Sequence, residues 1–248
     1  MSQIASQQNP RLKAVRRLQG KRERARQGTF VAEGEDLLEA AARAGREPLE
    51  GYRLAGTALG GERFHEVEPA ALASVSTLGS GTRVLAVYEQ RWGEPLEPLC
   101  VYLHGVSDPG NVGTVLRSAQ AFGASCVALG PGCADPHSPK AVRASMGAIF
   151  ATRLARVNDV AALPGERIAL VAGAGEPLSA LAEGAARPVT LLVGAERDGL
   201  PEAVVAACEH VAQIPIATES LNAAMAATVA LYEMTRRGAR DIDTVRAS

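Results

Sequence analysis

Polar groups suited to chemistry lie in three Gly-, Pro- or Asn-rich segments of the second half of the chain, each beside an apolar run. These segments are residues 108–118, 192–201 and 214–226. Their polar residues of interest are Asn111, Arg117, Glu196, Ser220 and Asn222. A fixed arginine can stabilise negative charge that develops on an oxygen, and positioned amides and carboxylates can orient the reacting group. Since α/β proteins usually build a site from several loops beside buried strands, we expect these residues to meet.

The elements that must position them follow a repeated strand–loop–helix pattern from residue 99 onward. Apolar runs predict strands at residues 99–103, 126–129, 168–172 and 189–193. Helical spacing predicts helices at residues 112–122, 141–150 and 221–236. This alternation indicates an α/β fold with a mostly parallel sheet and helices on both faces.

The first part of the chain differs in pattern and is expected to form its own domain. It combines a basic helix at residues 10–18, a strand and turn at 29–34, a helix at 36–44 and a strand at 83–88. Residues 89–98 contain two prolines, a glycine and three acids, which is typical of a linker. We therefore expect domains at residues 1–88 and 99–248, joined by a linker at 89–98.

The polar segments also contain recognisable motifs. The first has N-x-G-x-x-x-R at Asn111, Gly113 and Arg117, and the second has G-x-E-x-x-G at Gly194, Glu196 and Gly199. The third has I-P followed by S-L-N, at Ile214, Pro215, Ser220, Leu221 and Asn222. With a further stretch at residues 138–148, these motifs resemble, in this order, the SpoU (TrmH-like) family of RNA ribose 2′-O-methyltransferases, within the SPOUT superfamily.

That resemblance implies a fold, a reaction and partners. The sheet would contain a trefoil knot, and a small α/β domain similar to ribosomal proteins would precede it and bind the substrate. The enzyme would be a homodimer that uses S-adenosylmethionine, without a metal, to methylate a ribose 2′-hydroxyl in structured RNA. Ribosomal RNA is favoured over transfer RNA because of the extra N-terminal domain.

The resemblance also assigns roles to residues. The catalytic group would be Asn111, Arg117, Glu196, Ser220 and Asn222, and the residues beside the cofactor would be Gly194, Ile214 and Leu221. Arg117 would approach the 2′-hydroxyl and a phosphate, and we expect it to act through its charge because a guanidinium does not readily lose its proton. The chain departs from the family's usual form at Arg197, where a glycine is common, and in a shortened loop before Ser220.

Each of these residues has a plainer interpretation. Asn111 and Ser220 could be helix caps, Glu196 a surface acid, and Arg117 a surface arginine. Two other functions stay open as well. The chain could be a non-catalytic RNA-binding module, or a Rossmann enzyme for small molecules, although residues 169–178 lack the third glycine of that loop.

The net charge of the chain does not indicate a nucleic-acid partner, but the clustering of its basic residues does. The net charge is −1, yet residues 11–26 hold eight basic residues and one acid. The expected RNA-binding residues are Arg11, Lys13, Arg16, Arg17, Lys21, Arg22 and, through the family resemblance, Arg143. A solvated helix face is the alternative. The aromatic content of 4% disfavours recognition by base stacking.

Composition also limits the compartment and the chemistry. The four cysteines form no C-x-x-C pair and have no histidine at metal-ligand spacing, so they predict reduced thiols and no metal. No stretch approaches the ~20 apolar residues that cross a bilayer, and the N-terminus lacks an apolar signal core. We therefore expect a cytoplasmic protein without a membrane partner.

Overall fold

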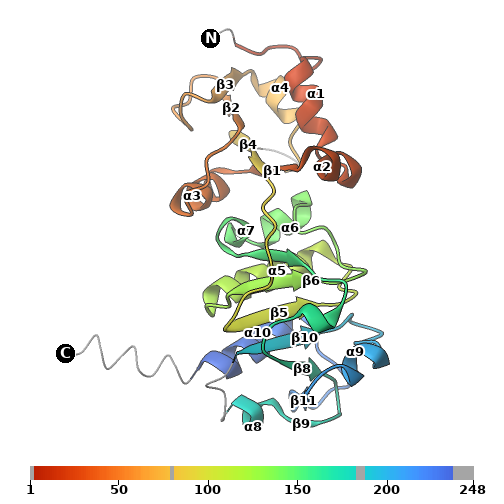
Figure 1. The fold of residues 1–248 in the computed structure, drawn as a ribbon. Helices are drawn as coiled ribbons and strands as arrows, with labels where there is room; N and C mark the ends of the chain where they lie inside the picture. The colour runs from red at the N-terminus through yellow and green to blue at the C-terminus, as the bar shows by residue number, and fades with distance from the viewer. Residues whose placement is uncertain (1–2, 79–80, 183–187, 237–248) are drawn as a thin grey trace, which may run out of the picture. The chain divides into compact units, whose positions relative to one another are not determined.

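The computed structural model describes residues 3–78, 81–182 and 188–236, which form two compact units (Figure 1). Unit 1 contains the residues up to Arg91 together with Asp135–Ala151. Unit 2 contains Trp92–Ala134 and the described residues from Thr152 onward. A division of the chain at residues 89–98 alone would separate residues 135–151 from the unit with which they pack.

Unit 2 is built on a parallel sheet. In its described part seven strands run in the order β7-β6-β5-β10-β8-β11-β9, and every pairing between neighbours is parallel. The strands are β5 (Leu99–Leu103), β6 (Cys126–Leu129), β7 (Leu154–Arg156), β8 (Glu166–Leu170), β9 (Glu176–Pro177), β10 (Val189–Val193) and β11 (His210–Gln213). The predicted parallel sheet is confirmed, although the sequence pattern did not reveal β7, β9 or β11.

Helices cover both faces of this sheet. The elements are α5 (Pro109–Ala121), η1 (Val160–Ala162), α8 (Leu178–Ala182), α9 (Glu202–Ala206) and α10 (Ala223–Thr235). Side chains on one face, such as Cys100 and Tyr102, form a core with Val204 of α9. On the other face α5 contacts β6, α10 contacts β10, and the two helices contact each other. The predicted α/β class is thus confirmed, and the knot stays a prediction.

Unit 1 is a small α/β domain around a mixed sheet in the order β1-β4-β2-β3. The strands are β1 (Thr29–Glu33), β2 (Glu50–Leu54), β3 (Phe64–Val67) and β4 (Val84–Glu89). The helices are α1 (Pro10–Arg17), α2 (Lys21–Gln27), α3 (Glu35–Arg43), α4 (Pro69–Ala73), α6 (Pro139–Ala144) and α7 (Ala148–Ala151). The basic helix begins where Asn9 accepts the backbone N–H of Arg11 at 2.9 Å, with Pro10 in the first turn.

The prediction of one helix over residues 141–150 was wrong, because α6 and α7 are separate. Met146 and Gly147 adopt positive φ angles of 49° and 93°, which no α-helix contains. A Cβ on Gly147 would lie 2.2 Å from the Cβ of Ala40 in α3. The break therefore lets α7 approach α3 closely, a requirement that local helical spacing does not reveal.

A buried ion pair attaches residues 135–151 to the N-terminal helices within unit 1. Arg24 is 3% exposed, and its Nε donates to Oδ2 of Asp135 at 2.8 Å. Its Nη1 donates to the carbonyl oxygens of Leu18 and Gln19 at 2.8 and 2.7 Å. The pair satisfies a guanidinium that would be costly to bury alone, and it spans 111 positions of sequence.

Aromatic packing adds to this attachment. Phe30 of β1 lies against His137 and Phe150, with ring centroids 4.8 and 5.8 Å apart. Tyr88 of β4 meets Phe150 edge-on at 4.8 Å. In a chain with four phenylalanines and four tyrosines, this concentration of rings indicates that unit 1 depends on the later segment for its core.

Neither unit offers a membrane span in its described residues, where no helix is long and apolar enough to cross a bilayer.

Removal of Asp135 should destabilise unit 1 strongly. Asp135→Ala leaves the buried Arg24 without its anion, which should lower the free energy of unfolding by about 3 kcal/mol. Urea unfolding followed by circular dichroism measures the loss. Arg26→Ala, which removes only an exposed pair with Glu23, is the control and should change little. Equal effects of the two substitutions would show that the Arg24 pair is not structural.

Candidate active site

The three polar segments follow strands that lie in one parallel sheet. The first comes after β5, the second after β10 and the third after β11. Because parallel strands present their carboxyl ends at the same edge, the segments gather there, as expected for an α/β site.

Glu196 joins the three segments through its carboxylate. Its Oε1 accepts the side-chain amide of Asn111 and, at 2.6 Å, the side-chain amide of Asn222. Nδ2 of Asn222 also lies 3.3 Å from Oδ1 of Asn111. Residues separated by up to 111 positions therefore form one hydrogen-bonded group, which supports a shared site over three separate surface roles.

Helix caps hold two members of this group in place. Asn222 caps α10, since its Oδ1 accepts the backbone N–H groups of Ala224 and Met225 at 3.0 and 3.3 Å. Asp108 caps α5 and accepts the backbone N–H of Asn111 at 3.1 Å. The plainer interpretation of Asn111 and Ser220 as caps is therefore wrong for both helices, and Asn222 combines capping with the site contact.

The turn that carries Glu196 is closed by backbone hydrogen bonds. Ala195 and Gly199 exchange N–H···O bonds of 3.1 and 3.0 Å, so residues 196–198 form its tip. A Cβ on Gly194 would lie 2.2 Å from the carbonyl carbon of Gly199, which explains the glycine there. Positive φ falls on Gly199, and Arg197 is not among the described residues with left-handed backbone, so the turn accepts it without strain.

A pocket of about 360 Å³ opens beside this turn. Its wall includes Gly194, Glu196, Ile214, Ser220 and Leu221, five of the residues expected to bind cofactor or take part in catalysis. Most of the remaining lining is apolar or backbone from the ends of β8 and β10 and from α10. The volume falls within the ~300–1,000 Å³ typical of small-ligand sites, so a cofactor of that size fits.

A second pocket, of about 260 Å³, is also lined by this turn. It is lined by residues 105–108, by Asn111 and by residues 195–198. Glu196 and Arg197 line both pockets. A group in one pocket and a group in the other would therefore meet at the Glu196 carboxylate.

The sequence missed one part of the first pocket. Leu170, Val171 and Ala172 line it at the end of β8, within the segment 169–178 that lacks the third glycine of a Rossmann loop. A segment without a dinucleotide-binding loop can still line a binding pocket. The available signal was an apolar strand that ends in small residues at the sheet edge where the other loops gather.

Arg117 is not placed with the others. It is exposed on α5 and lines neither pocket, and its side chain has no hydrogen bond or ion pair to any residue in the described ranges. His104, the first residue after β5, is held through Nδ1 by the hydroxyl of Tyr102 at 3.1 Å. Burial raises the pKa of Tyr102 to about 12, so the phenol keeps its proton near neutral pH.

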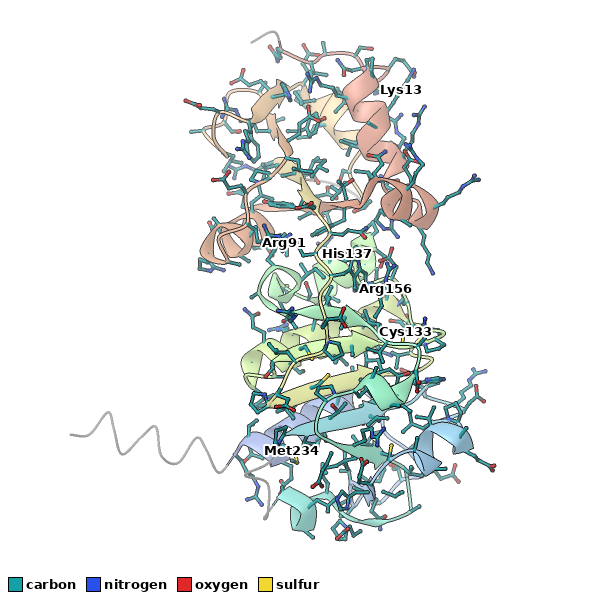
Figure 2. The ribbon with its side chains drawn as sticks, viewed as in Figure 1. Lys13, Arg91, Cys133, His137, Arg156 and Met234 are labelled. Carbon is teal, nitrogen blue, oxygen red and sulfur yellow. The ribbon has the colours of Figure 1, made fainter. Side chains whose placement is uncertain are left out.

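The basic residues of unit 1 divide into two groups. Arg11 pairs with Glu50, and Arg16 binds the carbonyl and hydroxyl oxygens of Ser74 at 3.2 and 3.0 Å. Four others have exposed side chains that form no hydrogen bond or ion pair with a described residue: Lys13 (labelled in Figure 2), Arg17, Lys21 and Arg22. This second group remains available for an anionic partner.

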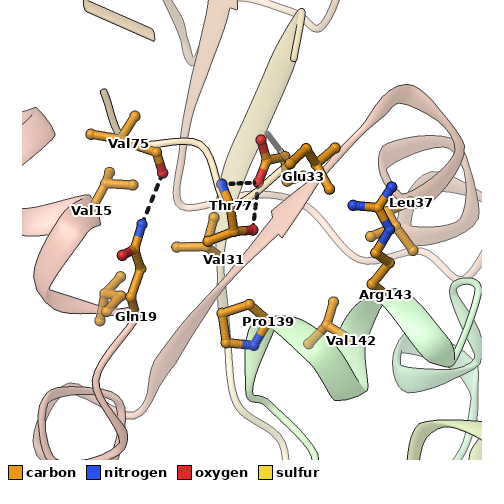
Figure 3. A pocket seen from close by; sticks show the side chains of 12 residues that line it. Val15, Gln19, Val31, Glu33, Leu37, Val75, Thr77, Pro139, Val142 and Arg143 are labelled. Atoms are coloured by element: carbon orange, nitrogen blue, oxygen red, sulfur yellow. Dashed lines mark hydrogen bonds between the residues drawn. The ribbon is translucent and has the colours of Figure 1, made fainter. Parts of the chain in front are cut away.

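Arg143 is exposed at the rim of a small cavity of about 30 Å³ in unit 1 (Figure 3). Pro139 and Val142 of α6 line the same cavity, as do Val15 of α1 and Val31 of β1. Its volume suits little more than a water molecule. Within the described ranges, moreover, no group of three or more His, Cys, Asp or Glu residues is arranged to hold a metal ion.

Solved structures resemble this one along nearly its whole length. An rRNA methyltransferase from Sinorhizobium meliloti, solved with AdoMet bound, is 30% identical with a TM-score of 0.85, covering 95% of this chain and 98% of that one. The SpoU methyltransferase AviRb from Streptomyces viridochromogenes, also in complex with AdoMet, is 26% identical with a TM-score of 0.82, covering 93% and 98%.

Gly194→Ala should damage the first pocket while leaving the fold intact. The added methyl group must displace the backbone of Gly199 and open the turn, so binding of S-adenosylmethionine, the cofactor that the sequence leads us to expect, should be largely lost in calorimetric titration. Gly61→Ala is the matched control, because its Cβ would meet nothing within 4 Å. Unchanged binding by the Gly194 variant would mean that the turn does not shape the binding site.

Sequence relatives and family models agree with the structures. An uncharacterized tRNA/rRNA methyltransferase of Synechocystis sp. is 31% identical over 96% of this chain and 94% of its own length. The 23S rRNA (guanosine(2553)-2'-O)-methyltransferase RlmP of Bacillus subtilis is 29% identical over 94% and 99%. Residues 9–87 match an MRM3-like substrate binding domain, and residues 98–232 match the SpoU rRNA Methylase family. With these matches over a site of this geometry, the chain belongs to the SpoU rRNA methylase family.

Proposed function

We propose that this chain transfers the methyl group of S-adenosylmethionine to a ribose 2′-hydroxyl of ribosomal RNA, in the cytoplasm. The observation that carries the proposal is the Asn111–Glu196–Asn222 group, whose carboxylate residue lines both a cofactor-sized pocket and a second pocket. Family membership supports the reaction type, and relatives named as rRNA 2′-O-methyltransferases support the substrate class.

The first pocket would hold the cofactor. Its apolar wall suits the adenine ring, and the backbone of Gly194, Ile214 and Leu221 offers polar groups around it. When bound, S-adenosylmethionine supplies a methyl group on a sulfonium centre. Glu196 and the two asparagines then orient the acceptor hydroxyl, which enters through the second pocket.

Arg117 would act in the site of a second copy of the chain. It lines neither pocket of its own subunit, and it lies on α5, which packs against α10. The outer face of α10 exposes an apolar stripe of Met225 (62% exposed), Val229 (41%) and Tyr232 (54%). These residues have the helical spacing i, i+4 and i+7, and a homodimer would cover them. Because α5 packs against α10, such a dimer would place α5 near the partner's site.

Unit 1 would bind the RNA. Lys13, Arg17, Lys21 and Arg22 are free of protein partners in the described ranges and can neutralise phosphates, which gives affinity without sequence readout. Arg11 and Arg16, by contrast, are engaged within the unit and contribute less.

The reaction is tested by transfer of a labelled methyl group to ribosomal RNA, followed by mapping of 2′-O-methylated positions. Arg117→Ala should lower kcat by roughly 10²–10³-fold because the alkoxide loses its cation, whereas Arg117→Lys should retain measurable activity. Arg63→Ala, which removes an exposed arginine of unit 1, is the control. An inactive but folded Arg117→Lys enzyme with normal RNA affinity would contradict a purely electrostatic role.

Calorimetry separates this function from its alternatives. A non-catalytic RNA-binding module would give no heat with S-adenosylmethionine. A transfer RNA enzyme would bind the cofactor but methylate transfer RNA in preference to ribosomal RNA.

The homodimer is tested by an acidic residue in the stripe. Val229→Glu buries a charge at the expected interface, so the protein should become monomeric in light scattering and lose activity. Leu49→Glu, at a residue 55% exposed in unit 1, is the matched control. Mixing Arg117→Ala with Asn222→Ala subunits should restore one intact site if the arginine acts across the interface, and no restoration would place it within its own subunit.

A further inference from the structure

Arg197 occupies an unusual place in the site. It lies at the tip of the turn closed by Ala195 and Gly199, and it lines both pockets. The residue is exposed and has no hydrogen bond or ion pair to any described residue. A guanidinium on a turn closed by backbone hydrogen bonds, beside two cavities and without an ion pair to a described residue, is available to a ligand.

The charges around the first pocket suggest which ligand group it meets. The charged side chains that line it are Glu196, Glu219 and Arg197, so among the described residues one cation faces two anions. S-adenosylmethionine carries the complementary set, because its single carboxylate is accompanied by a positively charged sulfonium and a positively charged ammonium group. Arg197 is the lining residue whose charge matches the carboxylate.

The second pocket argues against a phosphate as the main partner of Arg197. Its charged lining is acidic apart from this residue, with Asp108, Glu196 and Asp198. Three carboxylates around one guanidinium make an unfavourable place for a phosphate. The cofactor side of the turn has the smaller excess of acid.

We propose that Arg197 binds the carboxylate of the methionine moiety of S-adenosylmethionine and so determines selectivity for the intact amino-acid end of the cofactor. The inference rests on the proposed function, since it deepens the assignment of the first pocket. The planar guanidinium can donate two parallel N–H bonds to a carboxylate, which a glycine or a lysine at this position cannot reproduce. The closed turn positions the backbone of Arg197 beside the first pocket, and its long side chain can extend to the ligand carboxylate.

The test compares two ligands that differ in the carboxylate: S-adenosylmethionine and its decarboxylated analogue. Calorimetric titration of the full-length wild-type protein and of Arg197→Gln should show the variant binding S-adenosylmethionine roughly tenfold to a hundredfold more weakly. Binding of the decarboxylated analogue should be unchanged between the two proteins. Arg197→Lys should fall between them, and Arg63→Gln, an exposed arginine of unit 1, should match the wild type with both ligands.

Each outcome bears on a separate claim. If wild-type protein binds neither ligand, the proposed function fails. If it binds S-adenosylmethionine and Arg197→Gln binds it equally well, the inference about the carboxylate is overturned while the function stands. If the variant instead loses RNA affinity with normal cofactor affinity, Arg197 belongs to the acceptor phosphate and the inference is also overturned. Equal weakening toward both ligands would mean a change in the turn and would overturn it too.

Discussion

One carboxylate oxygen holds the site together. Oε1 of Glu196 accepts amide protons from both Asn111 and Asn222, and so joins the loops after β5 and β10 to the start of α10. A carboxylate accepts and an amide can donate, so the three side chains are complementary in hydrogen-bonding type. Loss of that acceptor would leave the loop after β10 without its side-chain hydrogen bonds to Asn111 and Asn222.

The sequence predicted the parts of this site better than their assembly. Apolar runs and turn residues located most of the central strands and the polar loops, because those signals are local. The break between α6 and α7 was not predictable, since it depends on the approach of Gly147 to Ala40, more than a hundred residues away. The contribution of residues 170–172 to the pocket was missed for the same reason, because only the tertiary arrangement of β8 beside β10 reveals it.

Charge type alone also did not reveal the role of each basic residue. In the run from residue 11 to 26, Arg24 is buried with Asp135 and stabilises unit 1, while Lys13 and Arg22 remain exposed. These side chains carry the same charge, so residue type alone does not distinguish them. Burial separates those that hold the fold from those that a polyanion can reach, and this separation lets RNA-binding substitutions be chosen without damage to stability.

Residues 135–151 belong to unit 1 but lie in the sequence between two parts of unit 2, which limits how the protein can be cut into separate domains. The backbone passes between the two units at residues 91–92, 134–135 and 151–152. Cleavage within 89–98 would therefore detach the N-terminal part of unit 1, while residues 135–151 stay covalently attached to unit 2. A truncated protein that starts at residue 99 would keep Ile149 and Phe150 but lose Phe30 and Tyr88, the rings against which Phe150 packs. Such a fragment should aggregate through its newly exposed apolar surface. A chimaera that replaces the N-terminal part of unit 1 with another domain would also have to replace residues 135–151.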